Sequence, residues 1–118
     1  MQADISLFMA IEKVVQDKMF SYQGIRVVKD VDLAEVFEVD VKELRTNVRK
    51  SMVRFPSDFM VEINDGEYAF TEPGIIMLGG LLKSERAIKA HLQFIEYFVH
   101  LAHKNGISIF DLLNSVNK

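Results

Sequence analysis

Side chains that suit nucleic acid gather in one stretch of the chain, between Lys42 and Arg54. The stretch carries five basic residues and one acid, hence a net charge of +4; because the whole chain has a formal charge of −3, the remainder carries −7. Arginine donates paired hydrogen bonds to guanine in the major groove, asparagine does so to adenine, and lysine suits phosphates. The candidate contact residues are Lys42, Arg45, Thr46, Asn47, Arg49, Lys50 and Arg54.

Two consecutive helices are expected to position these side chains. Asp30 or Asp32 can cap a helix that runs to about Glu38, and Asp40 can cap a second from Val41 to about Ser51, because Asp accepts hydrogen bonds from unpaired amides. The pattern predicts a helix-turn-helix pair. Glycine often occupies the turn of such a pair, whereas Glu38 stands there, so the corner must form without a positive-φ glycine or with strain.

The apolar spacing of the second helix predicts which of its faces is free. If Leu44 and Val48 point inward, the opposite face presents Lys42, Arg45, Thr46, Arg49 and Lys50, and Asn47 joins them only if it also faces outward. In that arrangement Lys50 and Arg54 suit phosphates and the others suit base edges. A basic solvated helix face is also common in proteins without a nucleic-acid partner, and the pattern alone leaves both interpretations open.

The remaining elements are expected to form one α+β domain over residues 1–118, with a core of about 20–101. Its architecture is a helix-turn-helix pair plus two short β-hairpins packed on a long C-terminal helix. Turn and capping signals place the other elements as follows: a helix Asp4–Asp17; strands Met19–Tyr22 and Ile25–Val28 around Gln23-Gly24; strands Phe59–Ile63 and Glu67–Phe70 around Asn64-Asp65-Gly66; a helix capped by Thr71 and ending near Gly79-Gly80; a long helix from Ser84 to about His103, stopped by Asn105-Gly106; and a short last helix, Ile109–Val116, within 104–118.

Motifs in a fixed order resemble the ORF-six-N domain family. Ile25–Val28 leading into Asp30–Ala34 looks like the start of that domain, Arg54–Met60 resembles its "RFP-x-DFM" segment, and Ala69–Leu78 resembles its "AFTE-x-G-x-x-ML" segment. The closing helix, Ala87–Val99, is also similar, so that the resemblance covers about Phe20 to Leu101. The family stands with the KilA-N and Bro-N domains of phages and large DNA viruses.

The resemblance implies sequence-specific binding of double-stranded DNA, in transcriptional regulation or antirepression. The lack of cysteines and of a signal-peptide pattern predicts a location in the cytoplasm, of a bacterial or phage-infected cell. The chain departs from the family in its short link from Met60 to Tyr68, where members often carry a longer basic insertion. It also shows no separate effector domain after the motifs. We therefore expect no DNA contact from this link, and we expect any effector domain to be supplied by another chain or by a longer natural protein.

Several motif residues also have a structural interpretation. We expect Phe55, Phe59 and Phe70 to anchor the core rather than to touch DNA, because burying each contributes roughly 1.5–3 kcal/mol. Arg54 is open between a phosphate contact and an ion pair with Asp58. Arg45→Ala or Arg49→Ala is expected to weaken DNA binding by roughly 1–3 kcal/mol if the residue reads a base, with the fold intact.

Catalysis and metal binding find little support in the sequence. The chain has no cysteine, no nucleophile-elbow serine and no phosphate-binding loop, so we expect no enzyme activity, catalytic residue, cofactor or small-molecule substrate. Glu96, His100 and His103 have a spacing that could hold a metal, although histidines near a helix C-terminus are also favoured by the helix dipole. No apolar run reaches the ~18 residues of a membrane span, so no membrane partner is expected.

A protein-interaction module is the competing hypothesis. The long helix is apolar nearly all round, with Ile88, Leu92, Phe94, Ile95, Phe98, Val99 and Leu101. One small domain is not expected to bury all of this surface together with that of the first helix. We therefore predict a homodimer through these apolar helices, either alongside DNA binding or without any direct DNA contact.

Overall fold

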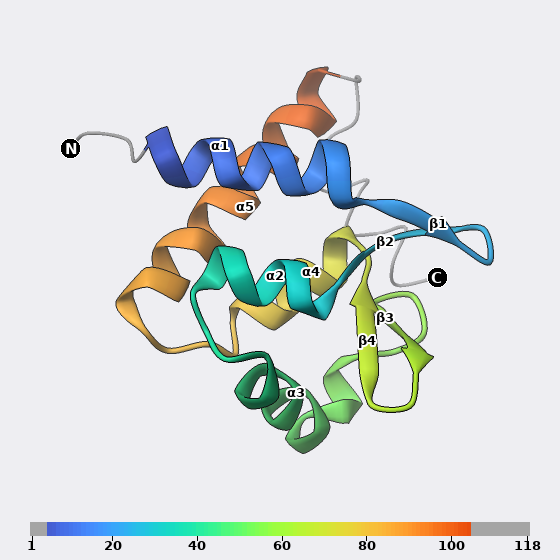
Figure 1. Cartoon of the computed structure of the whole chain (residues 1–118). Coiled ribbons are helices and arrows are strands. Elements are labelled where there is room, and N and C mark those ends of the chain that lie inside the picture. The colour runs from blue at the N-terminus through green and yellow to red at the C-terminus, as the bar shows by residue number, and fades with distance from the viewer. Residues whose placement is uncertain (1–4, 105–118) are drawn as a thin grey trace.

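The computed structural model describes residues 5–104, and its elements follow the expected order (Figure 1). The predicted last helix, Ile109–Val116, and the stop at Asn105-Gly106 lie outside the described residues. The elements are α1 (Ile5–Lys13), which continues as a π-helical turn (Val14–Lys18), β1 (Phe20–Tyr22), β2 (Ile25–Lys29), α2 (Asp30–Phe37), α3 (Val41–Lys50), a 3-10 turn (Met52–Arg54), β3 (Met60–Asn64), β4 (Glu67–Phe70), α4 (Glu72–Gly79) and α5 (Glu85–Lys104).

The α+β class and both hairpins are confirmed, but the hairpins form a single sheet. Its strand order is β1-β2-β4-β3, with every neighbouring pair antiparallel. The first hairpin turns at Gln23 and Gly24, both of positive φ, and the second turns at Gly66, with a φ of 78°. Pairing of Val28 with Phe70 joins the two hairpins. This joint places β2, which leads directly into α2, at the centre of the sheet.

Helices α1, α2 and α4 pack against the long helix α5, which forms the centre of the core. The Phe37 ring of α2 lies 5.4 Å from Phe94 of α5, and Phe94 lies 6.0 Å from Phe98. Phe55 meets Phe70 edge-on at 5.7 Å, and both are buried, as expected for core anchors. Phe59, expected to be a third anchor, is only partly buried and packs against the core from outside. In Figure 1, α1 and α3 lie at opposite ends of the molecule, so α3 sits at the edge of this core.

Three of the expected helix caps are present and one is wrong. Asp40 accepts a hydrogen bond from the Lys42 amide at 2.7 Å, Thr71 accepts from the Gly74 amide at 3.3 Å, and Ser84 accepts from the Ala87 amide at 3.1 Å. Helix α2, however, has Lys29 at its N-cap position, with no side-chain cap. The capping role predicted for Asp30 or Asp32 is therefore a misassignment.

The "AFTE-x-G" motif fastens the start of α4 to the entry of β3. The Thr71 hydroxyl donates to the Asp58 carbonyl at 2.6 Å, and the Thr71 amide donates to the Phe59 carbonyl at 3.0 Å. A Cβ at Gly74 would collide with that same Phe59 carbonyl, so only glycine allows the close approach. Within the described structure, this motif serves packing and backbone satisfaction.

Candidate nucleic-acid interface

Helix α3 attaches to the core along one stripe. Its only fully buried side chains are Leu44 and Val48, four residues apart and both at 0% exposure, and they join the core cluster. The inward orientation predicted for these two residues is confirmed. Because a helix turns by about 100° per residue, the far side of α3 must face solvent.

Four cationic side chains form an exposed group on this far side and just beyond it. We call them the basic face: Lys42, Arg49 and Lys50 of α3, with Arg54 of the following turn, all exposed. Within residues 5–104, none of the four forms a salt bridge with an acid. The open alternative of an Arg54 pair with Asp58 is therefore not realised in the structure, and both side chains are exposed.

Arg45 differs from the expectation, because it turns away from the basic face. Its Nε donates to Asp30 Oδ2 at 2.7 Å and its Nη2 donates to Asp30 Oδ1 at 3.2 Å. The hydrogen bond to Asp30 raises the pKa of Arg45 above its ordinary value. The side chain is 21% exposed and that of Asp30 is 2% exposed. Its guanidinium fork, which would have to meet a base, is already occupied by a carboxylate.

The Asp30 carboxylate joins three elements at one point. Asp30 is the first residue of α2. Its carboxylate accepts hydrogen bonds from Arg45 of α3 and, at 3.0 Å, from the Tyr68 amide of β4. A buried carboxylate is tolerated when charged and backbone donors satisfy its oxygens. This cluster therefore sets how α3 is docked against α2 and the sheet. The expectation that Arg45→Ala leaves the fold intact needs revision.

Thr46 and Asn47 are also less available than expected. The Thr46 hydroxyl donates to the Lys42 carbonyl at 2.9 Å and accepts from Arg49 Nη2 at 3.2 Å, so it orients the arginine. Asn47 is half-buried and lines a pocket of about 200 Å³ between α3 and the link from α4 to α5. It shares the lining of this pocket with Leu81 and therefore lies at the side of α3 rather than at its outer face.

The turn from α2 into α3 has a strained backbone, which is one of the two alternatives that the sequence left open for a corner without glycine. Glu38 has a φ of 54°, in the left-handed region, and its amide donates to the Glu35 carbonyl at 3.2 Å. Its carboxylate receives Arg86 of α5 at 3.2 Å. The corner is thus closed by backbone hydrogen bonds, and an exposed ion pair also connects it to α5.

Sequence reasoning overlooked the two side chains between Lys50 and Arg54. Met52 is 46% exposed and Val53 is 95% exposed, the highest value among the large apolar residues that the structure describes. Helical spacing extended past Lys50 would have placed Val53 on the same side as Arg49 and Lys50. The signal lies in that spacing, which continues past the predicted end of the helix near Ser51.

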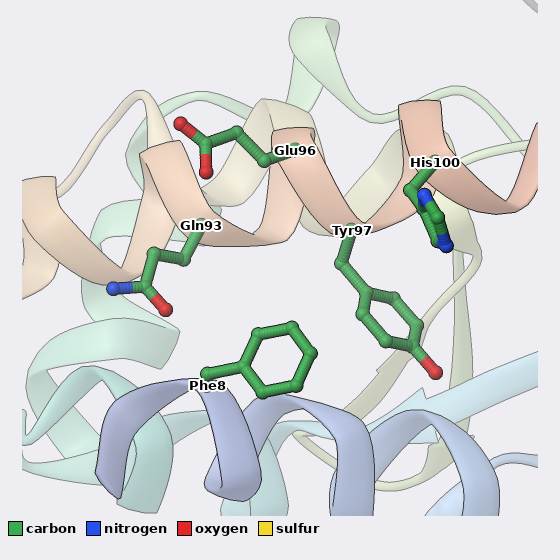
Figure 2. A pocket seen from close by; sticks show the side chains of 5 residues that line it. All are labelled: Phe8, Gln93, Glu96, Tyr97 and His100. Atoms are coloured by element: carbon green, nitrogen blue, oxygen red, sulfur yellow. The ribbon is translucent and has the colours of Figure 1, made fainter. Parts of the chain in front are cut away.

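A second cavity lies between α1 and α5, away from the basic face. It measures about 220 Å³ and is lined by Phe8, Gln93, Glu96, Tyr97 and His100. Figure 2 shows the Phe8 ring between the side chains of Gln93 and Tyr97, and Phe8 meets the Tyr97 ring edge-on at 6.2 Å. Such a pocket is smaller than the roughly 300–1,000 Å³ of typical small-molecule sites.

The metal alternative raised by Glu96, His100 and His103 gains no support from the geometry. Across residues 5–104, no three histidine, cysteine, aspartate or glutamate side chains come close enough together to hold an ion. No helix in the same range has the length and apolar character needed to cross a bilayer.

Comparison with known proteins gives one match. Residues 17–69 match the ORF6N domain, the family that the sequence motifs resembled. The matched segment runs from the end of the π-helical turn into β4 and contains α2, α3 and the basic face. No curated protein and no solved structure matches the chain.

Proposed function

We propose that this chain binds double-stranded DNA in a sequence-specific manner through the basic face of α3, because residues 17–69 match the ORF6N domain, whose family points to phage-type DNA binding and regulation. The role we assign is transcriptional regulation or antirepression, by binding rather than by catalysis. The observation that carries the proposal is the group of four exposed cations, Lys42, Arg49, Lys50 and Arg54, on an otherwise acidic chain.

The electrostatics of the chain favour one docking orientation. With −7 outside the stretch from Lys42 to Arg54, a polyanion is repelled by most of the surface and attracted to this end. The α3 helix has ten residues, about 15 Å in length, and a helix of that size fits the major groove of B-DNA. The charge asymmetry would therefore select both the face and the direction of approach.

The proposal divides the predicted contact residues into two groups. Lys42, Arg49, Lys50 and Arg54 contact the duplex, and Arg49 is the base-reading candidate because Thr46 holds its guanidinium in place. Arg45 acts as a positioning residue through Asp30. Asn47 and Thr46 stay near the interface without a free hydrogen-bonding group aimed straight outward, so the specificity depends mainly on Arg49.

Selection from a pool of randomised duplexes, followed by affinity measurement on the enriched sequence, tests this proposal. We expect an enriched motif, bound by the wild type and lost by Arg49→Ala/Lys50→Ala. The matched control is Lys13→Ala/Lys18→Ala, which removes the same charge from exposed lysines at the end of α1 and of the π-helical turn that continues it. Helix α1 lies at the opposite end of the molecule from α3 (Figure 1). An equal loss of DNA affinity in both variants would mean that only the net charge of the chain matters. If the wild type enriches no motif, sequence-specific binding is wrong.

A homodimer is the second candidate, and it is compatible with DNA binding. Ile5 and Met9 of α1 and Ile88 and Leu92 of α5 remain exposed, at 47–69% of their surface. Exposed apolar surface on helices is frequent at contacts between identical subunits. Light scattering after size exclusion should give twice the mass of 13.5 kDa at micromolar concentration, and Leu92→Glu should return the chain to a monomer. A monomeric wild type would eliminate this candidate.

A further inference from the structure

The turn after α3 presents an apolar tip at the C-terminal end of the basic face. Met52 and Val53 lie between Lys50 and Arg54 in the sequence, and all four side chains are exposed. Elsewhere in the described residues, the exposed apolar side chains of α1, α2 and α5 are less exposed than Val53. The tip is therefore a small apolar surface within a cationic border.

The exposure of Val53 results from a well-defined backbone. The Ser51 amide donates to the Val48 carbonyl at 3.0 Å, the Arg54 amide to Ser51 at 2.9 Å, and the Phe55 amide to Met52 at 3.0 Å. Phe55 then enters the core and packs edge-on against Phe70. The turn is thus hydrogen-bonded at each step and anchored by a buried ring, so the tip is held outward before any partner arrives.

The cationic border identifies the chemistry of the partner. A protein surface that covered Val53 would have to accommodate Lys50 and Arg54 beside it, whereas DNA supplies phosphates for the cations and apolar atoms next to them. In the major groove, the apolar group that a base presents is the 5-methyl group of thymine. An apolar side chain flanked by phosphate-binding residues matches that combination.

We propose that Val53, supported by Met52, contacts a thymine 5-methyl group at one edge of the bound site and so adds a specificity-determining contact. This inference rests on the proposed DNA binding by α3. The contact is apolar, so it contributes affinity for thymine without neutralising a phosphate. Burial of one methyl-sized group corresponds to about fourfold in affinity.

A cycle of protein and DNA substitutions tests the contact. The probe is the duplex enriched by selection with the wild type, in two forms: with thymine, and with deoxyuridine, which lacks the methyl group. We expect Val53→Ser to bind the thymine duplex about fourfold more weakly than the wild type does. On the deoxyuridine duplex, the two proteins should bind equally, because the partner of Val53 is already gone. Val53→Ile, which keeps the apolar surface, should retain the preference for thymine.

Salt dependence separates this inference from the function on which it rests. Val53→Ser should keep the wild-type slope of log affinity against log salt, whereas Lys50→Ala should reduce it by about 1. If Val53→Ser binds both duplexes as the wild type does, or loses equally on both, the methyl contact is wrong while DNA binding stands. If the wild type binds no duplex in a salt-dependent manner, the proposed function and this inference both fall. Unchanged circular dichroism of Val53→Ser excludes unfolding as the cause.

Discussion

Arg45→Ala tests whether this arginine holds α3 in place. Truncation would leave the Asp30 carboxylate, 2% exposed, with the Tyr68 amide as its remaining donor among the hydrogen bonds described above. Removing one partner of a buried ion pair costs about 3–5 kcal/mol, and the 21% exposure of Arg45 points to the lower end. We therefore expect a loss of about 3 kcal/mol in the free energy of unfolding, which lowers the melting temperature of a chain this size by about 10 °C.

Urea unfolding followed by circular dichroism measures this loss, and Arg49→Ala is the matched control. Arg49 lies one helical turn further along α3, is exposed, and hydrogen-bonds only to Thr46 among the contacts described. Its truncation should change the unfolding free energy by less than about 0.5 kcal/mol. A loss below about 1 kcal/mol for Arg45→Ala, or equal losses for both variants, would refute the docking role of the Asp30 cluster.

Three further substitutions test the packing, the strained corner and one partly buried acid. Gly74→Ala should destabilise the fold by at least about 2 kcal/mol in urea unfolding, because its methyl group would overlap the Phe59 carbonyl; a neutral effect would contradict the close approach. Glu38→Gly should raise stability by about 0.5 kcal/mol, since glycine relieves the φ of 54° at the cost of a weak exposed ion pair; a clear loss would mean that the ion pair matters more. Burial raises the pKa of Glu72, with Arg26 partly opposing it, so the folded state retains this proton at a pH where the unfolded chain has released it. The contribution of Glu72 to the free energy of unfolding is therefore lost as the pH rises above 4.5. Glu72→Gln should be more stable than the wild type at pH 7, and this difference in unfolding free energy should shrink at pH 4. A difference that does not depend on pH would contradict the raised pKa.

The local elements could be predicted because their signals are local. Asp40, Thr71 and Ser84 cap helices through contacts within three residues, and Gly24 and Gly66 occupy turns that need a positive φ. Such contacts depend on spacing along the chain, which the sequence displays directly. For the same reason, the buried stripe of α3 followed from its helical period.

The contacts that join separate elements could not be predicted in the same way. The carboxylate of Asp30 was assigned to its own helix, whereas it serves Arg45, which lies 15 residues away on another helix. The joining of two hairpins into one sheet through Val28 and Phe70 likewise depends on how β2 and β4 meet in three dimensions. A sequence pattern fixes which face of a helix is apolar, but not which neighbour its polar residues will meet.

The salt dependence of DNA affinity tests the central claim most directly. Three phosphate-facing cations, Lys42, Lys50 and Arg54, predict a slope of about −2.7 for log affinity against log salt concentration per bound chain. Substitution of any one of these three by alanine should reduce that slope by about one unit. A slope near zero for the wild type, or one that all three substitutions leave unchanged, would contradict the assignment of this face to DNA.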